Sequence, residues 1–146
     1  MEYFMVLMSK IEKVLEEYLR EKNNPLKDNF LADIVRNDIP KILADYLDDD
    51  KYLVKGSVGQ GQWAHIPWVA IFNKNITTSA TRGYDIVLLF QADMSGFYLT
   101  LNQGWTYYRE NYKPKSEAQK KIKKSLQFYR ENSKRFLHNL IVMLSI

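Results

Sequence analysis

The first part of the chain repeats apolar positions every three or four residues, which is the spacing of helices. Tyr3–Arg20 carries such a stripe along its whole length, and this predicts an amphipathic helix with one buried face. Asn23–Pro25 ends the pattern. Asp28 can cap a second helix, and Asp38 can cap a short third helix that runs to Leu47. The N-terminal third is therefore expected to be helical.

From Tyr52 onward the pattern changes to short apolar and β-branched runs that are separated by glycine or polar turns. Runs of this length and composition predict β-strands. The run Ile86–Phe90 is apolar at every position, which is typical of a central strand that is covered on both faces. The four predicted strands are Tyr52–Lys55, Trp68–Phe72, Ile86–Gln91 and Phe97–Leu101.

The last third returns to a helical pattern and is rich in lysine. Ser116 and Gln119 form a capping box at its start. The chain ends on the apolar run Leu140–Ile146. This run indicates either that the end docks onto the core or that the polypeptide continues, and we favour a module that continues.

These elements predict an α+β fold with a central mixed β-sheet, flanked by the N-terminal helices and by a long C-terminal helix. A chain of 146 residues suits one domain with its own hydrophobic core. We expect a helical acidic segment (1–50), a β-rich recognition core (51–112) and a basic C-terminal helix (113–146) within that single domain.

The net charge of +4 conceals an uneven distribution. Residues 1–51 hold 8 basic and 12 acidic side chains, whereas residues 52–146 hold 13 basic and 5 acidic ones. A strongly basic half is expected where a protein faces a polyanion such as nucleic acid. The lysine cluster Lys120–Lys124, taken alone, is more typical of the solvated face of a helix.

The segment Gly56–Trp68 joins a glycine-rich loop directly to the second predicted strand. Its sequence is G-S-V-G-Q-G-Q-W-A-H-I-P-W, and at its glycines the backbone can approach another molecule closely, because no Cβ intervenes. The loop lacks the ending of a Walker phosphate-binding motif and the spacing of a dinucleotide fingerprint. A polar loop anchored on an aromatic strand suits recognition and does not suit catalysis.

Few residues support catalysis or metal binding. Cysteine is absent, which excludes disulfides and thiolate sites and fits a reducing cytoplasm. His65 and His138 are the only histidines and lie in no multi-ligand spacing; His65 is equally expected to contact DNA or to be structural. No acidic pair with nuclease spacing follows Asp85 or Asp93. We expect no catalytic residue, metal or cofactor, and no membrane span, because no apolar run approaches about 20 residues.

Aromatic side chains crowd the β-rich half, and most of them must belong to the core. Trp68 differs because it directly follows the glycine loop, so one face of its ring can line a cavity there. Proteins that examine a base outside the double helix need an aromatic wall, a wedge and basic residues around the rim. The polar run Thr77–Arg82 offers further donors to phosphates, although a plain solvated turn has the same composition.

Three motifs follow one another in the middle third of the chain. They are G-x-G-x-W/F-x-x-I-P-W at Gly59–Trp68, G-Y-x-I-V-x-L-F-x-x-D at Gly83–Asp93 and G-x-Y-L-x-L-x-x-G-W at Gly96–Trp105. Together they resemble the N-terminal DNA-binding domain of McrB-type, modification-dependent restriction proteins. The flanking helices agree with this family in general character.

The resemblance implies a mixed sheet flanked by helices, placed ahead of a GTP-hydrolysing AAA+ motor that works with a separate McrC-like nuclease subunit. In relatives the domain recognises methylated cytosine in double-stranded DNA by flipping it into a pocket. By position, Trp68 and Leu89 would form this pocket. Gln60, which lies between Gly59 and Gly61, would probe the helix where the base leaves.

Two positions depart from the family pattern. Gln60 is smaller and more polar than the tyrosine that some relatives carry at the wedge. Asp85 stands where an aromatic pocket residue can occur, and the neighbouring Tyr84 is the candidate to replace it.

We therefore expect a single, non-catalytic DNA-binding domain over residues 1–146 that locates modified DNA for a cytoplasmic restriction complex. Two rivals stay open: a domain that reads DNA sequence or shape without base flipping, and a protein-interaction module of a defence complex. A small-molecule enzyme has the weakest support, because no acid–base or nucleophile arrangement is found. The predicted contact residues are Gly59, Gln60, Gly61, His65, Trp68, Arg82, Tyr84, Leu89, Lys120 and Lys124.

Overall fold

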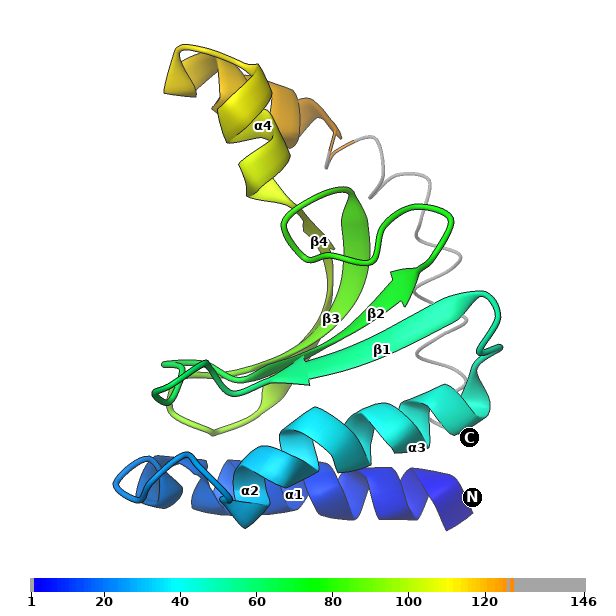
Figure 1. The fold of residues 1–146 in the computed structure, drawn as a ribbon, viewed down its shortest axis with the longest axis vertical. Helices are drawn as coiled ribbons and strands as arrows, with labels where there is room; N and C mark the ends of the chain where they lie inside the picture. Colours follow the sequence, from blue (N-terminus) through cyan, green and yellow to red (C-terminus); the bar gives the residue numbers. More distant parts are fainter. Residues whose placement is uncertain (1, 126, 128–146) are drawn as a thin grey trace.

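The computed structural model describes residues 2–125 and 127 of the chain, and Figure 1 shows its elements. Within this part, the helical segments come first and the strands follow. The helical segments are α1 (Glu2–Glu21), α2 (Phe30–Asp33), the π-helical turn η1 (Ile34–Asp38) and α3 (Ile39–Tyr46). The strands are β1 (Tyr52–Ser57), β2 (Trp68–Asn73), β3 (Tyr84–Phe90) and β4 (Phe97–Gln103), and the helix α4 (Trp105–Asn111) comes after them.

The four strands form one sheet in the order β1-β2-β3-β4, and every neighbouring pair is antiparallel. The α+β class is confirmed, but the expectation of a mixed sheet is wrong. A parallel pair needs a crossover connection, which is usually a helix. Here no helix lies between β1 and β4, and each strand turns back through a loop to pair with the one before it. All four predicted strands are present, with ends that differ from the prediction by one or two residues.

Residues 30–46 form one continuous helical rod, in which α2, η1 and α3 follow one another without a break. The sequence predicts two separate helices here because Pro40 has no backbone N–H and its ring clashes with the carbonyl four residues earlier. The structure accommodates the proline by widening the turn before it. The backbone N–H of Ile39 donates to the carbonyl of Ile34, five residues earlier, as in a π-helix.

The caps of this rod also differ from the predicted ones. Asn29 caps it, and its side-chain oxygen accepts a hydrogen bond from the backbone N–H of Leu31 at 2.9 Å. Asp28, the expected cap, has a left-handed backbone with φ of 57° one residue earlier. Asp38 makes no cap hydrogen bond and instead forms an ion pair with Lys10 of α1 at 2.7 Å.

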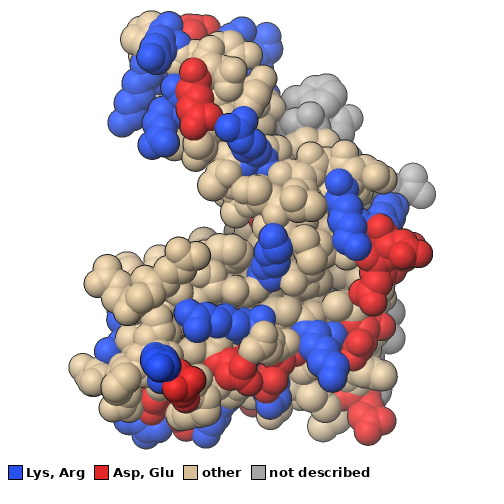
Figure 2. Space-filling model, in the orientation of Figure 1, with Lys and Arg blue, Asp and Glu red and all other residues tan. Residues whose placement is uncertain are grey.

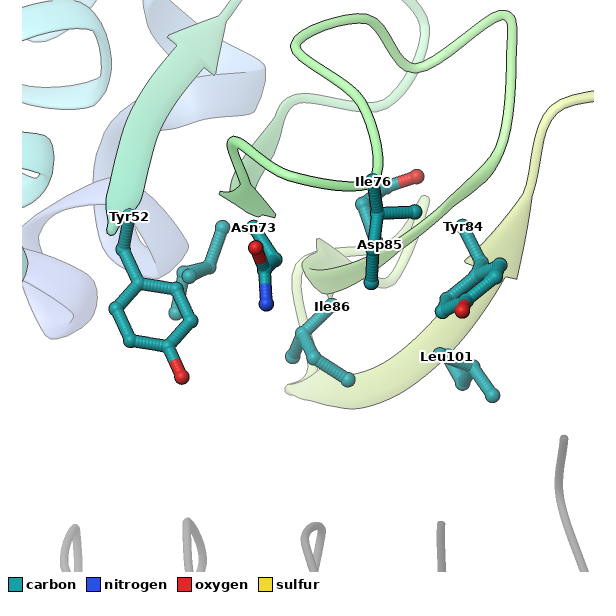
Figure 3. Close-up of a pocket in the computed structure, with 8 residues that line it drawn as sticks. Tyr52, Asn73, Ile76, Tyr84, Asp85, Ile86 and Leu101 are labelled. Carbon is teal, nitrogen blue, oxygen red and sulfur yellow. The ribbon is translucent and has the colours of Figure 1, made fainter. Parts of the chain in front are cut away.

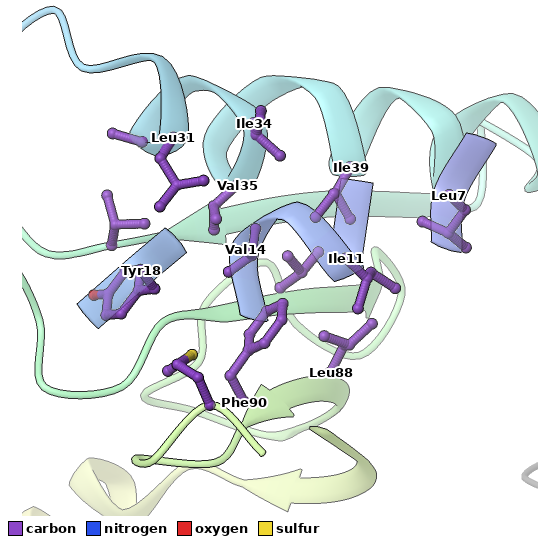
Figure 4. Close-up of a cluster of buried hydrophobic side chains, with 14 of the residues drawn as sticks. Leu7, Ile11, Val14, Tyr18, Leu31, Ile34, Val35, Ile39, Leu88 and Phe90 are labelled. Atoms are coloured by element: carbon purple, nitrogen blue, oxygen red, sulfur yellow. The ribbon is translucent and has the colours of Figure 1, made fainter. Parts of the chain in front are cut away.

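The helix α1 and the rod pack on one face of the sheet, which is called the covered face below. The main core lies between these helical segments and the sheet (Figure 4). The predicted amphipathic helix is confirmed, since α1 buries a stripe of side chains at helical spacing. Each strand contributes every second residue to this face, as the alternation of a strand requires. Core side chains include Leu7, Ile11, Val14, Tyr18, Leu31, Val35, Ile39, Val69, Leu88 and Phe90.

The opposite face of the sheet, called the second face below, carries the alternate residues of the same strands. A smaller buried cluster lies on it, formed by Ala70, Phe72 and Val87. In Figure 1 the sheet bends away from α1 and the rod and toward α4. The second face is therefore the concave face.

The chain after β4 forms a lobe of α4 and the helical residues 115–125, called the α4 lobe below. Figure 1 shows this lobe away from α1, at the far end of β3 and β4. Gly104 packs so closely on the β2–β3 loop that a Cβ would lie 2.2 Å from the backbone nitrogen of Arg82. Its N–H donates to the carbonyl of Gly83 at 2.8 Å, and Arg82 pairs with Glu110 at 2.8 Å. The β2–β3 loop thus braces the lobe.

Residues 115–125 are helical, as expected for the start of the C-terminal helix. The predicted capping box is wrong, because the helix begins before Ser116 and the N–H groups of Glu117 and Ala118 donate to the carbonyl of Pro114. The rest of that helix, His138 and the apolar run Leu140–Ile146 lie outside the described residues. In the described part of the chain, no helix combines the length and the apolar character that crossing a membrane requires.

Gly56 of β1 lies so close to η1 that a Cβ would stand 1.7 Å from the carbonyl oxygen of Val35. Because backbone is in the way, we expect Gly56→Ala to push the rod off the sheet and to destabilise the fold by about 3 kcal/mol. Urea unfolding would show this as a lower midpoint at an unchanged m-value.

Gly96→Ala is the matched control, because the atoms nearest to its Cβ belong to the flexible side chain of Gln91 at 3.9 Å. We expect it to change the free energy of unfolding by less than about 0.5 kcal/mol. Equal stability of Gly56→Ala and the wild type would contradict the close packing of rod and strand.

Candidate functional site

The glycine loop, residues 58–67 between β1 and β2, is closed at its base by a backbone hydrogen bond. The N–H of Ala64 donates to the carbonyl of Val58 at 2.6 Å. Gly59 has a φ of +103°, and a Cβ there would lie 2.2 Å from the carbonyl oxygen of Gln62. Only glycine fits this conformation and this space, so the residue fixes the turn of the loop.

The helical layer holds the loop through hydrogen bonds. The Tyr18 hydroxyl of α1 donates to the carbonyl of Ala64 at 2.7 Å, and the ring nitrogen of Trp63 donates to the carbonyl of Asn24 at 2.9 Å. The rings of Tyr18 and Trp63 meet edge to face with centroids 5.4 Å apart. Burial raises the pKa of Tyr18 to about 12, so its hydroxyl remains protonated and can donate at neutral pH.

The tip of the loop is exposed above this base. The guanidinium of Arg36 in η1 donates to the carbonyl of Gly59 at 2.7 Å, which fixes the point where the tip begins. Gln60, Gly61 and Gln62 are exposed, and a Cβ added at Gly61 would meet no atom within 4 Å. An exposed tip on a fixed base can enter a groove of another molecule without rearranging the loop.

The structure brings Trp68 and Leu89 together. They are direct partners in the register of β2 and β3, lie on the second face and are both half-buried. Trp68 also packs against the buried cluster on that face. His65 lies exposed on the loop, three residues before Trp68. An aromatic and an aliphatic side chain thus stand directly beside the base of the glycine loop.

Tyr84 is not brought to this pair. It lies at the other end of β3 from Leu89, and the alternation of the strand places the two side chains on opposite faces. Figure 3 shows Tyr84 near Leu101, at a cavity of about 180 Å³ that Tyr52 also lines. The geometry therefore gives Tyr84 no place beside Trp68.

Tyr98 of β4 is not among the predicted contact residues. Tyr98 is the partner of Leu89 in the register of β3 and β4, so Trp68, Leu89 and Tyr98 form one row across the second face. Its side chain is 59% exposed. The sequence could have predicted this position, because a tight hairpin that pairs Phe90 with Phe97 also places Leu89 opposite Tyr98.

Further along the second face, β3 carries a buried carboxyl group. Asp85 is 3% exposed, and one of its oxygens accepts a hydrogen bond from the side-chain amide of Asn102 at 3.0 Å. Its other oxygen has no hydrogen-bond partner among the described residues. Burial raises the pKa of Asp85, and the hydrogen bond from Asn102 partly offsets this by favouring the ionised form.

Positive charge is concentrated on the α4 lobe. Residues 105–127 hold 7 basic and 2 acidic side chains, and Figure 2 shows Lys and Arg gathered on this lobe. Lys120 and Lys124 are exposed. Arg82 is exposed as well, but its ion pair with Glu110 already balances part of its charge.

Figure 2 shows a hollow in the surface between the α4 lobe and the body of the molecule. The concave second face lies on this side of the sheet (Figure 1). The row with Trp68 and the glycine loop lie at one end of the strands, and the basic lobe lies at the other. Such a hollow can bind a polyanion on its basic side and a planar apolar group beside the loop.

Comparison with known protein families gives one match. A family model described as MrcB-like, N-terminal domain matches residues 13–143. The match includes the glycine loop, the whole sheet and α4. No curated protein and no solved structure matches the chain.

Replacing the buried acid by its amide, Asp85→Asn, is expected to stabilise the protein at neutral pH. Folding raises the pKa of Asp85 above its ordinary value of 3.8. Its contribution to stability is therefore full below that value and is lost as the pH rises through the raised pKa. Asparagine keeps the shape and can still accept from Asn102, but it carries no charge.

Urea midpoints measured from about pH 4 to pH 8 would show the gain growing with pH. The control is Asp93→Asn, because hydrogen bonds from Ser95 lower the pKa of the exposed Asp93. Its effect should have the opposite sign, a loss of stability that appears as the pH rises. A gain for Asp85→Asn that does not depend on pH would contradict this account.

Proposed function

Because the chain belongs to the MrcB-like N-terminal domain family, we propose that it is the DNA-binding specificity module of an McrBC-like restriction system. It recognises methylated cytosine in double-stranded DNA by holding the flipped base beside Trp68 and Leu89. The observation that carries this proposal is the placement of these two side chains as direct neighbours, next to the glycine loop.

The glycine loop supplies the element that opens the duplex. Tyr18, Trp63 and Arg36 hold its base, so the exposed Gln60 can enter the base stack while the loop keeps its shape. Extruding a base costs a few kcal/mol, and a loop that is already ordered adds little further cost on binding. The Gln60 amide offers both donors and an acceptor to the base that is left behind.

The α4 lobe supplies affinity that does not depend on sequence. Its exposed lysines, which include Lys120 and Lys124, neutralise phosphates and release counterions from the DNA. With the duplex in the hollow, this lobe holds the backbone while the loop and the row with Trp68 reach a base. Arg82 would contribute less, because Glu110 competes with phosphate for its guanidinium.

The module binds DNA and leaves the chemistry to its partners. An AAA+ motor in the same polypeptide hydrolyses GTP, and a separate McrC-like subunit cuts the DNA. The domain itself works in the cytoplasm without a cofactor.

The proposal is tested by fluorescence-anisotropy titration of matched duplexes that carry cytosine, 5-methylcytosine or 5-hydroxymethylcytosine in several sequence contexts. We expect the wild type to bind a modified duplex more tightly than the unmodified one. Trp68→Ala should lose about tenfold in affinity for the modified duplex, because stacking on an aromatic ring contributes about 1–3 kcal/mol per base. Trp68→Phe keeps a ring and should retain part of the affinity.

Trp68 packs against the buried cluster of the second face, so circular dichroism and thermal melting must first show that each variant is folded. Equal binding to all duplexes would leave a DNA-binding domain that reads sequence or shape without base flipping. No binding to any duplex at low salt would contradict the proposal and favour a protein-interaction module.

The combined substitution Lys120→Gln and Lys124→Gln is expected to weaken binding to every duplex alike. Each lost phosphate contact should reduce the slope of log K against log salt by about 0.9, so the pair should reduce it by up to about 2. The preference for the modified duplex should not change, because phosphate contacts carry no sequence information. Titrations at several salt concentrations measure both quantities.

Lys13→Gln is the matched control, since this lysine lies on α1 and pairs with Glu17. Its salt slope should equal that of the wild type. An unchanged slope in the double variant would mean that the duplex does not contact this part of the α4 lobe.

A further inference from the structure

We propose that Tyr98 is the second aromatic wall of the base pocket and faces Trp68 across Leu89. The extruded base is then held between two rings, with Leu89 beneath it. This inference rests on the proposed function. It adds a residue from a third strand and assigns the site to a planar base stacked on both sides.

The spacing of the strands suits this arrangement. Trp68, Leu89 and Tyr98 are successive partners across β2, β3 and β4. Neighbouring strands lie about 4.8 Å apart, so the Cα atoms of Trp68 and Tyr98 are about 9–10 Å apart. Side chains stand roughly upright on a sheet, and a base needs about 3.5–4 Å on each side to contact a ring. The two rings can therefore stand about 7–8 Å apart, which leaves room for one base between them.

The hairpin between β3 and β4 fixes the position of Tyr98. The N–H of Gln91 donates to the carbonyl of Gly96 at 2.9 Å and closes the turn. On the covered face, the adjacent Phe97 packs against Phe90, with ring centroids 6.4 Å apart, and joins the main core. The backbone that carries Tyr98 is therefore held from the other side of the sheet.

Exposure separates Tyr98 from the buried cluster of the second face. Ala70, Phe72 and Val87 are buried on that face, whereas the side chain of Tyr98 remains 59% exposed. A ring that is open to solvent, two strands from the half-buried Trp68, has surface available for stacking. Because so much of it is exposed, its removal should leave the fold intact.

A double-mutant cycle between the ring and the base tests the proposal. Wild type and Tyr98→Ala are titrated with two duplexes. One carries the modified cytosine that the wild type prefers, and the other carries a stable abasic residue at that position. Tyr98→Ala should bind the first duplex about five- to 150-fold more weakly than the wild type does. On the abasic duplex the two proteins should agree within about twofold, because no base remains to stack.

Two further variants complete the test. Tyr98→Phe keeps the ring and should bind both duplexes as the wild type does. Tyr3→Ala removes a ring of similar exposure, 54%, on α1, and should change neither affinity.

The outcomes separate the inference from the function on which it rests. Equal weakening of Tyr98→Ala on both duplexes would indicate a structural role and overturn the inference, as would full affinity for the modified duplex. In either case a wild type that prefers modified DNA leaves the proposed function standing. A wild type without any such preference would remove the base pocket and Tyr98 with it.

Discussion

The contact between the backbones of η1 and β1 is the constraint on which the rest of this structure depends. Gly56 has no side chain, so the carbonyl of Val35 can lie where a Cβ would otherwise be. This closeness brings the helical layer directly against the start of the glycine loop. Arg36, the next residue of η1, then reaches the carbonyl of Gly59, and Tyr18 of α1 reaches the far side of the same loop. The base of the glycine loop is therefore held by contacts with the helical layer as well as by the hydrogen bond within the loop.

The covered face of the sheet supplies most of the core, and the proposed function assigns recognition to the second face. The covered face buries the main core against α1 and the rod, while the second face presents its row of side chains to the hollow. Charge follows the same division, since residues 1–51 have an excess of acidic side chains and the α4 lobe has an excess of basic ones. In the proposed function, this distribution attracts a duplex to the lobe and repels it from the helical layer, which orients it toward the second face before any base is contacted.

Local pattern was sufficient to predict α1 and the four strands, but not α4, which was placed in the β-rich core, nor the pairing of the strands or the contacts of single side chains. The four strands follow from apolar runs between turns, yet a run of residues such as Ile86–Phe90 looks the same in parallel and antiparallel sheets. Pro40 predicts a helix break, because the sequence does not show that a π-turn can accommodate it. For the site, adjacency to the loop pointed to Trp68, and the family resemblance placed Leu89 beside it; the register of β2 and β3 makes the two direct partners. Tyr84 and Tyr98 lie on opposite faces of the sheet, and this can be known only once the register of the hairpin between β3 and β4 is known.

In the proposed pocket, the aromatic walls Trp68 and Tyr98 and the aliphatic floor Leu89 contribute differently to binding. Stacking acts on the face of a base, and cytosine and methylcytosine present nearly the same face, so the rings of Trp68 and Tyr98 stabilise either base once it is extruded. They recover the cost of extrusion without choosing between the two. The choice depends on the edge that carries the methyl group, and burying one such group contributes only about 0.8 kcal/mol, or about fourfold in affinity. An aliphatic floor such as Leu89 can supply this increment, because it offers apolar contact and leaves no polar group unpaired. A larger preference requires that the unmodified base be penalised at the same edge, and that penalty has to come from side chains around the rim and not from the rings.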